Sequence, residues 1–194
     1  SLLKNAHVFE IIKNAKNYGI DIPSYSVNWP KIIQRSRNIA KRLNKGIEYL
    51  MKKNKVDHFS GFGSIVDKNT VSIKNDTKTQ SLHAEFIILA AGTTQRNLPG
   101  LSIDGKLIIS SREAMILDKI PKEIVIIGAG AIGVEFAHLF NTFGSKVTLV
   151  EAMPAITPNE DADISKELTS IFSKRKIKIL TNKKVEKVEK LKSS

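Results

Sequence analysis

The chain has 194 residues, of which 41% are hydrophobic, and a formal net charge of +12. This is enough apolar material for one large or two small domains, but no run approaches the ~18 consecutive apolar residues of a membrane span. The N-terminus lacks the pattern of a signal peptide. Without cysteine the chain can form no disulfide or thiolate metal site, and its 4 histidines lack ligand spacing. We therefore expect no metal centre and no membrane segment.

The first part of the chain is expected to be helical. Apolar residues at helical spacing predict a helix that begins at or before Ser1 and ends before Gly19, and a second, basic helix over about residues 31–54. The basic side chains are most simply a solvated face, because aromatic residues do not interleave with the lysines as base stacking requires. We therefore expect no nucleic-acid partner despite the net charge.

Beyond Asn54 the pattern changes to strands. Short alternating segments predict strands at 56–60, 64–67, 71–74 and 81–84. Asn75 and Asp76 form a turn between the last two. The Gly61-Phe62-Gly63 sequence interrupts the first pair, as a bulge or a backbone contact to a ligand would.

A second group of elements precedes the most informative motif. The apolar segment 85–91, which ends at Gly92, predicts a strand of the buried type. An extended stretch over 103–110 and a short helix over 111–117 are expected next.

The sequence from Ile124 to Glu151 has the pattern of a dinucleotide-binding unit. The β-branched run 124–127 predicts a parallel strand buried on both faces. Gly128 allows a sharp turn, Gly130 lets backbone approach a pyrophosphate, and Gly133 lets the next helix pack closely. That helix ends at Gly144 and has an apolar stripe made of Ile132, Phe136, Leu139, Phe140 and Phe143.

Glu151 decides the predicted nucleotide. It stands at the carboxyl end of the strand 146–150, 23 positions after Gly128, against about 20 expected for the acidic residue that accepts hydrogen bonds from the ribose hydroxyls of NAD. An arginine in the segment 152–159 could bind the 2′-phosphate of NADP, but this segment contains none. A glycine triplet alone would also fit an ordinary strand–helix turn, but the correct spacing of all the parts favours a dinucleotide site.

The remaining segment continues the alternation of strands and helices. Asp161 or Asp163 caps a helix that runs to about Lys174, and a strand over 177–180 follows. Residues 183–190 predict the start of another strand. The helix is expected to turn inward its apolar side chains Ile164, Leu168, Ile171 and Phe172. The order predicts a right-handed parallel βαβαβ half.

Taken together, the segments resemble the dihydrolipoamide dehydrogenase family, the flavoprotein reductases of 2-oxo acid dehydrogenase complexes within the pyridine nucleotide-disulfide oxidoreductases. The resemblance spans essentially the whole chain. It is carried by Ser1-Leu2-Leu3, the run from Asn44 to Leu50, Lys53-Asn54-Lys55-Val56, Gly61-Phe62-Gly63, the run from Leu89 to Thr93, Leu98-Pro99-Gly100, and Ile120-Pro121-Lys122 leading into the glycine motif.

The resemblance implies an α/β fold with a partial FAD-binding domain of helices and a β-meander over residues 1–103, followed over 104–194 by half of a Rossmann-type NAD-binding domain with a parallel sheet. It implies FAD and NAD as cofactors, with no catalytic residue in this chain, although Glu135 reaches toward the flavin and nicotinamide. Glu135 could alternatively be a solvent-facing helix carboxylate. The implied cofactor-binding residues are Gly63, Ala91, Gly92, Thr93, Gly128, Ala129, Gly130, Ala131, Ile132, Gly133, Val134, Glu135 and Glu151.

The chain also departs from the family pattern. The family usually has threonine where this chain has Ala91, which removes one hydroxyl from the flavin loop. The redox-active Cys-x4-Cys pair, the first flavin glycine motif, the Gly-Asp return strand, the interface domain and the catalytic histidine are not found in these 194 residues. We therefore expect a fragment of a chain about twice as long, inactive alone because dithiol chemistry needs an attacking thiolate.

The parent is expected to be a homodimer that acts on lipoyl domains of complexes such as the pyruvate dehydrogenase complex, in the bacterial cytoplasm or the mitochondrial matrix. Two alternatives stay open. One is another FAD- and NAD(P)-dependent reductase of a disulfide, a metal or an electron carrier. The other is a stand-alone NAD-binding module that senses NAD or docks on an acidic partner through its basic helix.

Overall fold

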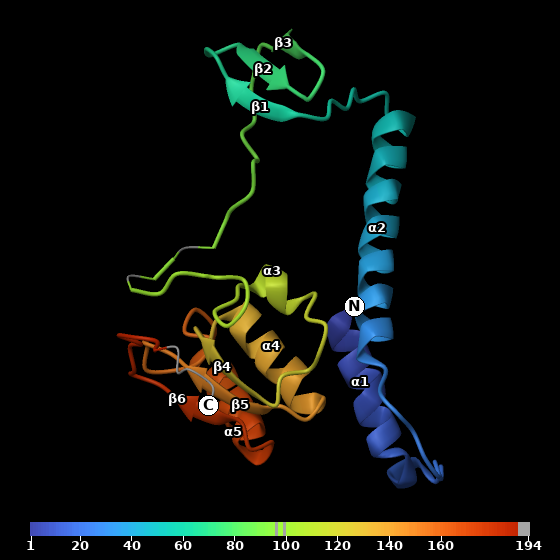
Figure 1. The fold of residues 1–194 in the computed structure, drawn as a ribbon, viewed down its shortest axis with the longest axis vertical. Coiled ribbons are helices and arrows are strands. Elements are labelled where there is room, and N and C mark those ends of the chain that lie inside the picture. The colour runs from blue at the N-terminus through green and yellow to red at the C-terminus, as the bar shows by residue number, and fades with distance from the viewer. Residues whose placement is uncertain (96, 99, 190–194) are drawn as a thin grey trace. The chain divides into compact units, whose positions relative to one another are not determined.

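A computed structural model describes residues 1–95, 97–98 and 100–189. Its fold is of the predicted α/β class, with one antiparallel and one parallel sheet (Figure 1). The elements in chain order are α1 (Leu2–Lys13), the 3-10 helix η1 (Ala15–Tyr18), α2 (Trp29–Lys53), β1 (Phe62–Ile65), β2 (Thr70–Lys74), β3 (Thr79–His83), α3 (Ser111–Ala114), β4 (Glu123–Ile127), α4 (Ala131–Thr142), β5 (Lys146–Val150), α5 (Ala162–Lys174) and β6 (Lys178–Leu180).

The chain forms two compact units. One comprises residues 1–39 together with 96–194, and the other comprises residues 40–95. The predicted boundary between residues 103 and 104 concerns cofactor domains and stays a prediction.

The unit 40–95 contains the antiparallel sheet, in the order β1-β2-β3. The turn between β2 and β3 forms as predicted, because the Oδ1 atom of Asn75 accepts hydrogen bonds from the backbone N–H groups of Thr77 and Lys78 at 3.1 and 2.9 Å. The strand predicted at 56–60 does not form. Phe62 and Gly63 lie within β1, so the glycines do not interrupt a strand pair there.

The prediction of a strand over residues 85–91 is wrong, because these residues form no strand in the structure. The segment belongs to no regular element and pairs with no strand of the described residues, and the side chains of Phe86, Ile88 and Leu89 are 81%, 91% and 74% exposed. A strand needs a neighbour for its backbone N–H and C=O groups. No strand of the described residues lies beside it.

The other unit contains the parallel sheet, in the order β4-β5-β6, with Ile124 opposite Val147 and Leu149 opposite Ile179. Helix α4 packs against one face of this sheet, and α1 packs on α4 (Figure 1). The fully buried large side chains are Phe140, Leu139, Leu149, Ile156 and Val147. This core fixes the strand ends that carry the glycine motif.

The predicted ends of two helices are confirmed. Gly144, with a φ of 99°, follows the C-cap residue Phe143 of α4. Asp161 is the N-cap of α5, and its side chain accepts a hydrogen bond from the N–H of Asp163 at 2.8 Å.

Some predicted burial is wrong in this unit. Strand β4 is covered on one face only, because no element of the described chain packs over Val125 and Ile127. Ile132, Ile164 and Ile171 are exposed although their spacing predicts that they face inward. Ile132 and Ile164 lie in the first turns of their helices, where few neighbours reach them. Residues 183–189 form no strand, and residue 190 lies outside the described residues.

Candidate dinucleotide-binding site

The glycine loop lies between β4 and α4, at the carboxyl end of the parallel strand β4. The N–H of Gly128 donates to the carbonyl oxygen of Val150 at 2.8 Å, and the φ of Gly128 is 98°, a conformation that favours glycine. A Cβ atom on Gly133 would lie 1.9 Å from the carbonyl oxygen of Gly128. The sequence-based reason for a glycine at 133, close packing of helix and strand, is therefore visible in the structure.

Ala129 is held from two sides. Its N–H donates to Oε2 of Glu151 at 2.7 Å, and its carbonyl oxygen accepts from the N–H of Thr157 at 2.7 Å. Its side chain is fully buried. Hydrogen bonds within the protein therefore define the backbone conformation at the centre of the loop.

The carboxylate of Glu151 accepts hydrogen bonds from the protein backbone on both of its oxygens. Its other carboxylate oxygen, Oε1, accepts from the N–H of Met153 at 2.9 Å, and the residue is only 9% exposed. An ionised carboxylate has about four acceptor positions, so two hydrogen bonds leave room for ribose hydroxyls. Sequence reasoning placed Glu151 at this strand end but missed its bond to Ala129, for which no sequence signal exists.

The N-terminus of α4 is the part of the site that suits an anion. Gly130 is its N-cap, no side chain caps it, and its first turn contains no acidic residue. A Cβ atom on Gly130 would meet nothing within 4 Å, so the space beside this residue is open. The free N–H groups of Ala131, Ile132 and Gly133 and the helix dipole favour a phosphate there.

The remaining residues predicted to bind a cofactor make fewer contacts or lie exposed. Val134 continues the first turn of α4, with its N–H donating to the carbonyl oxygen of Gly130 at 3.1 Å, and Glu135 is exposed one residue later. Gly63 lies exposed in β1. Residues 91–93, the predicted flavin loop, are exposed and belong to no regular element. Their cofactor roles stay predictions.

A titratable cluster outside the predicted site joins α1 to α4 and α5. The carboxylate of Glu10 accepts from the Nη1 atom of Arg175 and, at 3.1 Å, from Oγ1 of Thr142. Partial burial acts to raise the pKa of Glu10, but the hydrogen bond and charge of Arg175 outweigh it, so the pKa is lowered. Burial lowers the pKa of His138, whose Nδ1 atom lies 3.3 Å from Nη1 of Arg175.

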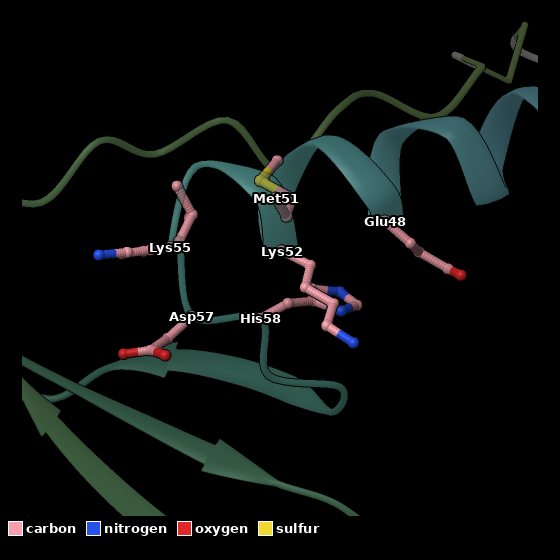
Figure 2. Close-up of a pocket in the computed structure, with 7 residues that line it drawn as sticks. Glu48, Met51, Lys52, Lys55, Asp57 and His58 are labelled. Carbon is pink, nitrogen blue, oxygen red and sulfur yellow. The ribbon is translucent and has the colours of Figure 1, made fainter.

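A hollow elsewhere in the molecule contains none of the predicted site residues. It lies at the end of α2, in the unit 40–95, and Figure 2 shows that the side chains of Lys55 and Asp57 extend away from those of Lys52 and His58. Charged groups that do not converge form a poor binding site.

Within the described residues, no group of three or more side chains could hold a metal ion. None of the helices described is both long and apolar enough for a transmembrane segment.

The comparison with known families agrees with the geometry of the loop. The family described as pyridine nucleotide-disulphide oxidoreductase matches residues 2–194. The chain belongs to this family. Its members are oxidoreductases that use FAD and a nicotinamide dinucleotide, so the resemblance to flavoprotein disulfide reductases is confirmed.

Similar curated proteins are named dihydrolipoyl dehydrogenase. That of Chlorobaculum tepidum is 40% identical over 189 residues, covering 97% of this chain and 40% of the relative. That of Bacillus subtilis is 36% identical over 194 residues, covering 95% and 41%. A mitochondrial one from Schizosaccharomyces pombe is 39% identical over 188 residues, covering 95% and 37%. The chain thus spans about 40% of the length of these relatives.

Solved structures show the same fold. LpdA from Mycobacterium tuberculosis has a TM-score of 0.84 at 23% identity, covering 93% of this chain and 40% of the other. The Cu(II) complex of the HOCl-induced flavoprotein disulfide reductase RclA from Escherichia coli has a TM-score of 0.74 at 26% identity, covering 92% and 39%.

Proposed function

We propose that the full-length protein oxidises dihydrolipoyl groups of 2-oxo acid dehydrogenase complexes, passing electrons through a redox disulfide and FAD to NAD. The observation that carries this proposal is the ordered glycine loop, with Glu151 bound to Ala129 and an uncapped α4 N-terminus beside it. The names of the similar proteins support the substrate class.

In this proposal the described loop is the exit for electrons. Residues 104–194 hold NAD, with Gly128–Glu135 around the pyrophosphate and Glu151 at the ribose, while residues 1–103 contribute to the flavin site through Gly63 and the loop 91–93. The 194 residues contain no cysteine, so the disulfide that exchanges with dihydrolipoyl groups has to come from other residues.

The proposal extends to partners and location. The lipoyl domains of a complex such as the pyruvate dehydrogenase complex would be the electron donors, and a homodimer would be the working form. The compartment would be the bacterial cytoplasm or, in a eukaryote, the mitochondrial matrix. The mitochondrial relative from Schizosaccharomyces pombe supports the second possibility.

The test is a steady-state assay of the purified full-length gene product. We expect a bound flavin visible in the absorbance spectrum, reduction of NAD by dihydrolipoamide, and much slower reduction of NADP. Bound flavin and NADH oxidation without any turnover of dihydrolipoamide would contradict the proposed substrate.

A second candidate is a reductase of another disulfide or electron acceptor. The likeness to RclA, a disulfide reductase solved as a Cu(II) complex, favours this alternative. The same preparation, assayed with NADH and glutathione disulfide or Cu(II) as acceptor, distinguishes the two functions.

A further inference from the structure

Thr157 has an unusual backbone conformation in the loop between β5 and α5. Its φ is 46°, although it is β-branched, and it is only 8% exposed. A left-handed conformation is unfavourable for such a residue and persists only where the surrounding contacts impose it. The contacts of Thr157 therefore indicate what this conformation achieves.

The backbone of Thr157 bridges the glycine loop and the first turns of α5. Its N–H donates to the carbonyl oxygen of Ala129 at 2.7 Å. Its carbonyl oxygen accepts from the N–H of Glu160 at 2.9 Å and from Oγ of Ser165 at 3.2 Å. One residue thus connects the predicted phosphate loop to a rigid helix.

The side chains of Thr157 and Ser165 form a second link. Their hydroxyl oxygens lie 3.1 Å apart, and Ser165 is buried. Since Ser165 has a single hydroxyl proton, its bond to the Thr157 carbonyl oxygen makes Thr157 the donor in the hydroxyl pair. Ser165 therefore takes part in both bonds, and removing its hydroxyl breaks both.

We propose that Thr157 and Ser165 are positioning residues that hold the glycine loop in its NAD-binding conformation and thereby set NAD affinity. The inference rests on the proposed role of this loop as the NAD site. Glu151 holds the N–H of Ala129, and Thr157 holds its carbonyl oxygen from the other side. A loop ordered before binding has less conformational freedom to lose when the nucleotide arrives.

The experiment compares three variants of the full-length gene product. Ser165→Ala removes both hydroxyl bonds, while Thr157→Val keeps the β-branched shape and removes one. Thr169→Val is the matched control, because its Oγ1 donates to the carbonyl oxygen of Ser165 at 2.7 Å, within α5, and does not contact the loop. The measurements are the dissociation constant of NAD, kcat at saturating NAD, and hydrogen exchange of the Ala129 amide without nucleotide.

We expect Ser165→Ala to weaken NAD binding about tenfold and Thr157→Val about threefold, with kcat unchanged and faster Ala129 exchange. The double variant should equal Ser165→Ala, since both changes act on the same bonds. Thr169→Val should leave all three measurements unchanged.

Several results would overturn the inference. One is a Ser165→Ala protein that binds NAD and exchanges Ala129 as the Thr169→Val protein does. If Ser165→Ala fails to fold, Thr157→Val decides in the same way. A wild-type protein that binds NAD but does not turn over dihydrolipoamide contradicts the proposed substrate and leaves this inference standing, whereas one that binds no NAD overturns both.

Discussion

Two loops of this chain have similar sequence patterns but different structures. Both the loop 128–130 and the loop 91–93 follow an apolar run and contain glycine, and both are predicted to contact a dinucleotide. In the first, Ala129 is buried and hydrogen bonded on both sides. In the second, all three residues are exposed, and the apolar run before them is exposed as well.

The difference follows from strand pairing. Strand β4 pairs with β5, so the loop after β4 meets the end of a neighbouring strand and the acidic residue there. The segment before residue 91 has no neighbouring strand among the described residues. The loop 128–130 is therefore a defined site because the end of β5 and the segment after it supply hydrogen-bond partners on both sides of Ala129.

The largest effect is expected where the ordered loop is tightest. Gly133→Ala would place a Cβ atom 1.9 Å from the carbonyl oxygen of Gly128, and neither backbone can move without displacing β4 or α4. We expect a loss of roughly 3–5 kcal/mol in the free energy of unfolding and no NAD binding. Urea denaturation and NAD titration measure the two effects.

Its control lies in the other unit. Gly46 is in the interior of α2, and an added Cβ atom would meet nothing within 4 Å. Gly46→Ala should stabilise the protein by about 0.5–1 kcal/mol through helix propensity. Equal effects of the two substitutions would contradict the assigned role of Gly133.

The next largest effect is expected at Glu151, whose carboxylate accepts the hydrogen bond from the Ala129 N–H. Glu151→Arg removes the acceptor for the Ala129 N–H and introduces a cation suited to a 2′-phosphate. We expect NAD to bind about 100-fold more weakly and the preference to shift toward NADP, as measured by titration of each nucleotide. An unchanged preference would mean that Glu151 is only a structural carboxylate.

Between pH 7 and 4, acid should weaken the unit that contains the ordered loop more than residues 40–95, where hydrogen bonds from Asn69 and Thr70 lower the pKa of Asp67 from an ordinary value of 3.8, below this range. The pKa values of Glu10 and His138 are both lowered in the folded state, from ordinary values of 4.5 and 6.5. The unfolded chain therefore binds protons first, and stability falls as the pH decreases. The contribution of His138 is complete above pH 6.5 and that of Glu10 above pH 4.5, and each is lost as the pH falls through its folded-state value.

Hydrogen exchange across pH 7 to 4 tests this expectation, with α1 and α4 as the reporting helices. Glu10→Gln should flatten the lower part of the pH dependence, and His138→Gln should flatten the upper part. Equal acid sensitivity in β1–β3 would show that Glu10 and His138 are not responsible.

The smallest effect is expected in the exposed apolar run. Leu89→Ser in the 194-residue chain should change the free energy of unfolding by less than about 0.5 kcal/mol, because the side chain is largely exposed. In the full-length protein the same change should cost about 2 kcal/mol or more if the run becomes a buried strand. Equally small effects in both proteins would argue against the predicted buried strand.

Local patterns predicted the elements that local chemistry controls. The spacing of Gly128 and Gly133, the turn at Asn75 and the cap at Asp161 were predicted from residue types, because each depends on neighbours within a few positions. The predictions of a strand at 56–60 and of an inward-facing Ile164 are wrong, since pairing and burial depend on distant residues.

The alternation of strands and helices over residues 124–180, the glycine motif and the position of Glu151 at a strand end are therefore determined by the sequence alone. Only the tertiary structure decided that Glu151 accepts a hydrogen bond from the loop itself, that Thr157 adopts a left-handed conformation while donating to Ala129, and that the run before Ala91 pairs with no strand of the described residues. The spacing of hydrophobic residues and the chemistry of turns depend on residues close together in the sequence. Hydrogen bonds across 22 or more positions depend on how the packed sheet brings those residues together.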